Sequence, residues 1–126
     1  MDYRTPMSRV IGLGSAKDGV DHWWNQRLTA IAMIPLTLLA VFPLAGAIGS
    51  DYATVRATYA EPFNALVMIL FLAVTFRHLQ LGLQVVIEDY VRGEPQRTGA
   101  HLANKAFCLV MGLTGVFGVL KIAMTA

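Results

Sequence analysis

The chain has few charged residues for its length, and this scarcity decides its broad class. Of its 126 residues only 14% are charged while 56% are hydrophobic, and the formal net charge is +2. A soluble core does not need so much apolar sequence, so the composition indicates an integral membrane protein. The few charges stand at the ends of apolar runs rather than in a basic patch, which excludes a nucleic-acid-binding protein.

The sequence also has little cysteine and lacks the glycine-rich motif that binds dinucleotide cofactors. The single cysteine, Cys108, lies inside an apolar run, so we expect a small buried packing residue rather than a ligand or half of a disulfide. The chain has no set of cysteines for an iron–sulfur cluster and no dinucleotide fingerprint. Chemistry that needs those two cofactors must therefore reside in another chain.

No cleavable targeting segment is recognisable at the amino terminus. The first long apolar run begins near Leu28, which is too late for the core of a signal peptide. The first residues also lack the Arg and Ser richness of a mitochondrial transit peptide. We therefore expect a multi-pass chain of the bacterial cytoplasmic (inner) membrane in preference to the mitochondrial inner membrane.

Three apolar stretches predict an all-α integral membrane fold. We expect transmembrane helices over about residues 22–48, 62–91 and 103–124, because about 20 apolar residues cross the hydrocarbon core of a bilayer. Asp21 is expected to cap the first helix, and Pro62, after Glu61, to occupy the first turn of the second.

The remaining segments contain the turn-forming residues. Residues 1–20 mix glycine and proline with charges, which favours an irregular segment on the cytoplasmic side. Residues 50–61 are expected to form a polar connection and residues 92–100 a turn-rich break. In the third span, small residues three apart predict close packing against a neighbouring helix; they are Gly112, Gly115 and Gly118.

Lysine and arginine lie mainly on one side of the expected spans. One set lies before the first span or in its first residues: Arg4, Arg9, Lys17 and Arg27. A second set surrounds the second connection: Arg92, Arg97 and Lys105. The first connection holds only Arg56. Because cytoplasmic loops are enriched in Lys and Arg, we expect the amino terminus and the second connection to be cytoplasmic.

His78 is the residue around which we expect a functional site. Ionisable side chains are rare at membrane depth, and neutral imidazole is a common haem ligand, so His78 is either a haem ligand or a histidine hydrogen-bonded to another helix. Gly82, about one turn away, leaves room for a flat group near the backbone. Since neither His22 nor His101 can plausibly reach His78, a second axial ligand would come from a partner subunit.

Two further positions carry polar chemistry near the expected inner boundary. Asp89 and Tyr90 are either interfacial residues or a carboxylate and phenol that hold and protonate a quinone carbonyl. Arg27 is either a positive-inside anchor or the partner of a haem propionate or quinone-site anion. The sequence leaves the role of His22 open, and Trp23 and Trp24 suit the headgroup region.

Two stretches carry a resemblance to a known family: Gly19-Val20-Asp21-His22-Trp23-Trp24-x-x-Arg27 and, later in the chain, His78-x-x-x-Gly82-x-Gln84-x-x-x-x-Asp89-Tyr90-Val91. Together they resemble the smaller cytochrome b membrane-anchor subunit of succinate dehydrogenase, respiratory complex II. The resemblance covers most of the chain, and the spacing from the histidine to the Asp-Tyr pair is its specific part. Some members of that family have His-Asp where this chain has Asp-His.

The resemblance implies a single membrane-anchor domain over residues 1–126, forming half of a haem-binding heterodimeric helix bundle. His78 would be an axial ligand of haem b shared with the larger cytochrome b anchor subunit. Tyr90 would hydrogen-bond ubiquinone, Asp89 would provide a proton route, and Arg27 would lie near the haem propionates or the quinone. Electrons would arrive from the flavoprotein and iron–sulfur subunits, so this subunit would not be catalytic alone.

The polar half of the second span also permits a different class of protein. In a non-haem three-helix scaffold or small transporter component, His78 would be a hydrogen-bonding or proton-relay residue.

Overall fold

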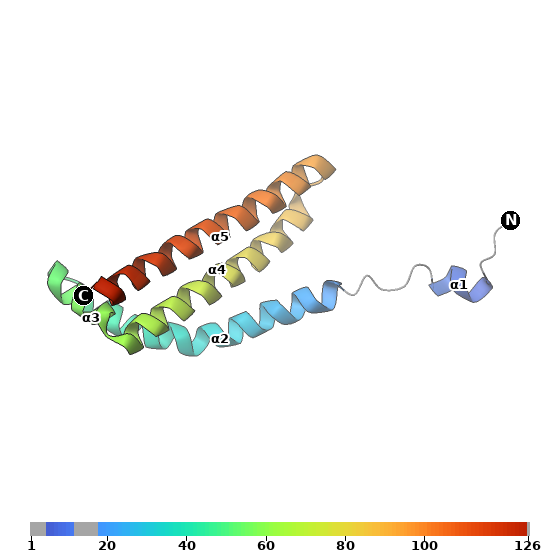
Figure 1. Ribbon diagram of the computed structural model, residues 1–126. Coiled ribbons are helices and arrows are strands. Elements are labelled where there is room, and N and C mark those ends of the chain that lie inside the picture. The colour runs from blue at the N-terminus through green and yellow to red at the C-terminus, as the bar shows by residue number, and fades with distance from the viewer. Residues whose placement is uncertain (1–4, 12–17, 126) are drawn as a thin grey trace.

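The structure, a computed structural model, describes residues 5–11 and 18–125, which are almost entirely helical (Figure 1). The helices are α1 (Pro6–Ile11), α2 (Asp18–Ala47), α3 (Tyr52–Ala60), α4 (Pro62–Tyr90) and α5 (Glu94–Thr125). Three of them, α2, α4 and α5, are long and apolar enough to cross a membrane. The predicted all-α membrane fold with three spans is therefore confirmed.

Helix α4 is the central element of the bundle. It packs along its length against α2 on one side and α5 on the other, and these three helices lie side by side in Figure 1. Within the described residues α2 and α5 do not contact each other, and α1 contacts none of the other helices. A functional side chain inside the bundle is therefore expected on the faces of α4 that contact α2 or α5.

Capping interactions define the start of α4. Glu61 accepts a hydrogen bond from the backbone N–H of Asn64 at 2.9 Å, and Pro62 occupies the first helical position. Proline suits this position because its missing N–H would have no partner there and its φ angle is already helical. The prediction that the second span begins at Glu61 and Pro62 is confirmed.

The first connection contains a short helix rather than being irregular throughout. Gly49 has a φ of +79°, a conformation that glycine adopts without steric cost, and it ends the turn after α2. Asp51 then caps α3 by accepting a hydrogen bond from the Thr54 N–H at 2.9 Å. Arg56 of α3 donates to the backbone carbonyl of Thr125, so α3 is tied to the end of α5.

The break before the last span is shorter than the sequence predicts. Helix α5 begins at Glu94, not near residue 103, and only residues 91–93 are non-helical. The expectation of a break over residues 92–100 was wrong because Pro95 lies in the first turn of α5, where proline is tolerated.

Two expectations at the amino terminus also need correction. Asp21 is not a cap, because α2 begins three residues earlier and Asp21 is inside it, where its carbonyl accepts a hydrogen bond from Asn25. The segment 1–20, expected to be irregular, includes α1 and the start of α2, while residues 1–4 and 12–17 lie outside the described part.

The interior of the bundle is small, and most large apolar side chains point outward. The buried apolar residues are Ala40, Tyr59, Ala65, Val67, Leu81 and Cys108. The prediction that Cys108 is a buried packing residue is confirmed. An outer surface this apolar suits lipid or partner helices rather than water.

Candidate functional site

The contact between α2 and α4 contains a row of polar side chains. His22, Gln26 and Thr29 follow the spacing i, i+4, i+7 on α2, so they lie on one face of the helix. Two of them meet α4: Thr29 contacts His78, and the side-chain amide of Gln26 lies 3.6 Å from the position of a Cβ on Gly82. We call these five residues the α2–α4 polar seam.

The shortest polar contact in the seam joins Thr29 and His78. The Thr29 hydroxyl lies 2.9 Å from Nδ1 of His78. The same hydroxyl lies 2.8 Å from the carbonyl oxygen of Asn25 and 3.0 Å from that of Gln26, within its own helix. His78 is half-buried between the two helices, and its ring orientation is therefore set by a polar contact from α2.

The other ring nitrogen of His78 is free within the described part of the chain. Nε2 has no hydrogen-bond partner there, and it is not among the buried polar atoms that lack one. It therefore reaches the surface of the chain. An imidazole held by Nδ1 with an accessible Nε2 is the arrangement that metal-ligating histidines commonly show.

Two neighbouring polar atoms of the seam are buried without partners: Nε2 of His22 and Oε1 of Gln26. Buried polar atoms are normally hydrogen-bonded, and an unpaired one carries a free-energy cost. The seam therefore has unused hydrogen-bonding capacity beside His78 and Gly82, which fits a bound polar group or ordered water.

Asp89 and Tyr90 lie at the last turn of α4, away from the interior. Both are exposed, with 81% of the Tyr90 surface accessible. Neither side chain makes a hydrogen bond or ion pair within the described residues, although Gln84 donates to Glu88 at 2.9 Å on the same turns. The phenol and the carboxylate are therefore available to a partner or ligand at this end of the bundle.

Arg27 is an exposed residue of α2 and does not join the seam. Its guanidinium lies 5.4 Å from the centre of the Trp23 ring, in a cation–π contact. Trp23 in turn stacks with Trp24, with 5.8 Å between ring centres. Arg27 has no carboxylate partner in the described residues, so its planar fork is free to bind an anion.

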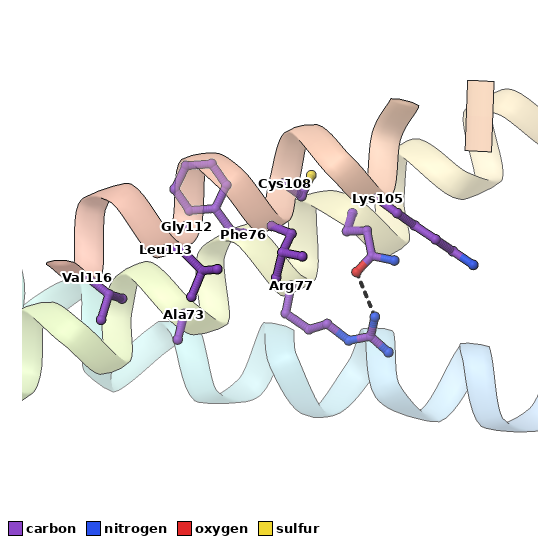
Figure 2. A pocket seen from close by; sticks show the side chains of 10 residues that line it. Ala73, Phe76, Arg77, Lys105, Cys108, Gly112, Leu113 and Val116 are labelled. Atoms are coloured by element: carbon purple, nitrogen blue, oxygen red, sulfur yellow. Dashed lines mark hydrogen bonds between the residues drawn. The ribbon is translucent and has the colours of Figure 1, made fainter. Parts of the chain in front are cut away.

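A second polar feature lies on the other side of α4, in a groove of about 240 Å³ between α4 and α5 (Figure 2). Arg77 donates to Gln80 at 2.7 Å, and Lys105 lines the same end of the groove. The rest of the lining is mostly apolar and includes Phe76 and Leu113. Asn104, buried nearby, donates to the Gln80 carbonyl at 2.9 Å and links α5 to α4.

The structure brings together only part of the residue set singled out from sequence. His78 and Gly82 face α2, whereas the adjacent pair Asp89 and Tyr90, and Arg27 on α2, lie on exposed surfaces. No side-chain hydrogen bond or ion pair joins them in the described residues. No group of three or more His, Cys, Asp or Glu side chains able to hold a metal ion occurs among the described residues. Among the described side chains of the seam, His78 combines one ring nitrogen in a polar contact with a second that is accessible.

Sequence reasoning missed Thr29 and Gln26 as members of the site. The spacing His22, Gln26, Thr29 was the available signal, because three polar side chains on one face of an apolar helix indicate a protein-facing stripe. Which partner each one meets on α4 depends on helix rotation and could not be obtained from that spacing.

The fold and the seam together define a helical integral membrane protein with an imidazole held between two of its three spans. The chain belongs to the succinate dehydrogenase/fumarate reductase transmembrane subunit family, whose model matches residues 1–119. The resemblance drawn from the His78 to Tyr90 stretch is thus confirmed.

Individual relatives agree with this assignment. The chain is 35% identical to the succinate dehydrogenase hydrophobic membrane anchor subunit of Paracoccus denitrificans over 112 residues, covering 89% of this chain and 83% of that protein. It is 34% identical to the subunit of the same name from Rickettsia bellii over 110 residues, covering 86% and 87%. With the succinate dehydrogenase membrane anchor subunit of Reclinomonas americana it shares 37% identity over 84 residues, covering 64% and 70%.

No solved structure matches the chain significantly. The relatives and the three apolar helices support a bacterial multi-pass membrane protein with the role of a membrane anchor in an oxidoreductase complex.

Proposed function

We propose that this chain is one of two haem-bearing anchor subunits of a succinate:quinone oxidoreductase, and that it supplies one axial ligand of haem b and part of the ubiquinone-reduction site. The observation that carries the proposal is His78, half-buried in a membrane span with Nδ1 engaged by Thr29 and Nε2 free. A haem suits such an imidazole because neutral imidazole is a common ligand of haem iron, and the resemblance of the His78 to Tyr90 stretch implies haem b.

The residues around His78 fit a haem. Nε2 is accessible, and Gly82 on the same face of α4 adds no side chain of its own; the neighbour nearest to its Cβ position is the flexible amide of Gln26, at 3.6 Å. A second ligand would come from the larger cytochrome b anchor subunit. When bound, haem b would supply a one-electron carrier within the membrane, while His78 holds it in register with α4.

Tyr90 and Asp89 are assigned to the quinone. Reducing ubiquinone to ubiquinol takes two electrons, which come from the iron–sulfur subunit, and two protons, which come from the aqueous side. The exposed Tyr90 hydroxyl can donate a hydrogen bond to a quinone carbonyl, and Asp89 beside it can pass protons toward that oxygen. No nucleophile is required, in agreement with the residue types present.

Arg27 is assigned to an anion near this end of the bundle, either a haem propionate or a quinone-site anion. Its stacking on Trp23 holds the guanidinium at the surface of α2 with its N–H donors free. Such donors match a carboxylate in two-point geometry.

The proposed setting is the bacterial cytoplasmic membrane with the amino terminus in the cytoplasm. The excess of Lys and Arg before α2 and around residues 91–93 supports this orientation. It places Arg27, Asp89 and Tyr90 on the side where flavoprotein and iron–sulfur subunits would dock.

The test is a reduced-minus-oxidised visible spectrum of the complex purified through this chain, comparing wild type, His78→Leu and His101→Leu at equal amounts of assembled protein. His101, half-buried in α5, is the matched control because it is outside the seam. We expect a b-type signal in wild type and His101→Leu, and its loss or alteration in His78→Leu. A spectrally silent wild type would favour the non-haem scaffold or transporter component instead.

A further inference from the structure

The contact between Thr29 and His78 has a defined direction, which can be worked out from the hydrogen-bonding capacity of a hydroxyl. A threonine hydroxyl has one hydrogen to donate and two lone pairs that can accept. Two backbone carbonyls of its own helix, those of Asn25 and Gln26, lie within 2.8 and 3.0 Å. Threonine inside membrane helices commonly donates to the carbonyl one turn back, and the geometry here matches that pattern.

With its hydrogen directed at the α2 backbone, the hydroxyl offers a lone pair toward α4. The atom on that side is Nδ1 of His78 at 2.9 Å. A contact at this distance between a lone pair and a ring nitrogen is a hydrogen bond only if the nitrogen carries the hydrogen. His78 therefore has its hydrogen on Nδ1, and the lone pair of the neutral ring is on Nε2.

The opposite assignment leaves a polar hydrogen without a partner. If the hydroxyl donated to Nδ1, the neutral ring would carry its hydrogen on Nε2, which has no acceptor among the described residues. An unsatisfied N–H at membrane depth is costly, whereas a lone pair on Nε2 can bind a metal. Both the donor count and the surroundings of Nε2 therefore favour the first assignment.

We infer that Thr29 is a positioning residue that fixes the tautomer and the ring orientation of His78, so that Nε2 presents its lone pair to the haem iron. The inference rests on the proposed function of His78 and extends it to a residue on another helix. Histidine ligands are generally held by a hydrogen bond from their other ring nitrogen to a carboxylate, a carbonyl or water. Here the hydroxyl of Thr29 on α2 has that role, so the packing of α2 on α4 sets the tautomer and the ring orientation of His78.

The hydrogen bond also affects the electron-donating strength of the ring. An acceptor at Nδ1–H raises the basicity of the imidazole, which stabilises ferric over ferrous iron. Removing the acceptor should therefore raise the haem reduction potential and loosen the ring orientation. A residue that only fills space at this position would produce neither change.

The experiment uses the assembled complex with three substitutions in this chain. Thr29→Val keeps the shape and removes the hydroxyl, Thr29→Ser keeps the hydroxyl and removes the methyl group, and Thr114→Val is the matched control. Thr114 bonds only to the Val110 carbonyl of its own helix and is exposed. Haem content per flavin, the potentiometric midpoint and the electron paramagnetic resonance spectrum of the ferric haem are measured for each.

We expect Thr29→Val to raise the midpoint potential and shift the ferric resonance, with haem content per flavin unchanged or reduced about twofold. Thr29→Ser and Thr114→Val should match wild type in all three readouts. If Thr29→Val does not assemble, Thr29→Ala takes its place, and the comparison with Thr29→Ser is unchanged.

Two results would overturn the inference: a valine (or alanine) variant with the wild-type midpoint and resonance, or a serine variant shifted as far as the valine variant. His78→Leu, measured in parallel, separates the inference from the proposed function. If His78→Leu loses the haem signal while Thr29→Val resembles wild type, only the role of Thr29 fails. If wild type has no haem, or His78→Leu leaves its signal unchanged, the proposed function fails as well.

Discussion

Gly112 of α5 lies directly against Phe76 of α4, and a Cβ added at Gly112 would come within 3.3 Å of the Phe76 Cβ. One turn further along, a Cβ at Gly115 would lie 3.1 Å from a methyl group of Leu72. At Gly118 no described residue comes within 4 Å of an added Cβ. Close packing at the first two glycines, predicted from sequence, is confirmed, whereas the third faces open space in the described part of the chain.

Substituting Gly112 should therefore destabilise the bundle. We expect Gly112→Val to lower stability by roughly 1–3 kcal/mol, the usual effect of overpacking a close contact. The measurement is the melting temperature of the purified complex, with Gly118→Val as the matched control, because an added Cβ there meets none of the residues that the structure describes. Equal losses in both variants would show that the α4–α5 contact does not account for the effect.

Tyr90→Phe should lower quinone reduction while leaving succinate oxidation with a soluble acceptor nearly intact. The substitution removes only the phenol hydroxyl from an exposed side chain, so folding should not change. The loss in the quinone rate should be about a hundred- to a thousandfold if one donor to the developing charge is lost. The two activities are measured on the same preparation, and equal loss of both would contradict the assignment.

Arg27→Ala should reduce haem retention or quinone turnover more than it reduces membrane insertion. The variant loses the guanidinium fork that lies over Trp23. Arg27→Lys is the informative companion because it keeps the charge and loses the planar two-point geometry. If both variants assemble with unchanged haem content and rate, Arg27 is an anchor and nothing more.

Asn104→Leu should weaken the packing of α5 on α4. The buried amide donates to the Gln80 carbonyl at 2.9 Å, and interhelical hydrogen bonds in membranes are worth roughly 0.6 kcal/mol on average. Denaturation of the complex in detergent measures the change. Asn25→Leu, which removes an exposed bond within a single helix, is the control, and a larger loss in that control would contradict the prediction.

The cap of α3 should fail in acid. Hydrogen bonds from Thr54, through its hydroxyl and its backbone N–H, hold the pKa of Asp51 below its usual value of 3.8. Because the folded-state pKa is lowered, the stabilisation is present above the unfolded pKa and is lost as the pH falls through the folded pKa. Hydrogen exchange of α3 amides, corrected for intrinsic rates, should lose protection below about pH 4 in wild type, with a smaller change in Asp51→Asn.

Several features could be predicted because each depends on a short stretch of sequence. The three spans follow from long apolar runs, and the start of α4 follows from the adjacent Glu61 and Pro62. The errors occurred where one residue type permits two structures. Pro95 is typical of a break but also suits the first turn of a helix, and Asp21 is a residue type typical of a cap although α2 begins before it.

The sequence by itself determined the membrane class, the number of spans and the residues able to carry chemistry, because composition and apolar length act locally along the chain. The tertiary structure alone decided that Thr29 faces His78, that Gln26 lies beside Gly82, and that Arg27 lies outside the seam. Those pairings depend on the rotation and register of α2 on α4. Helical periodicity defines a face on each helix, but only packing decides which residues of two faces meet.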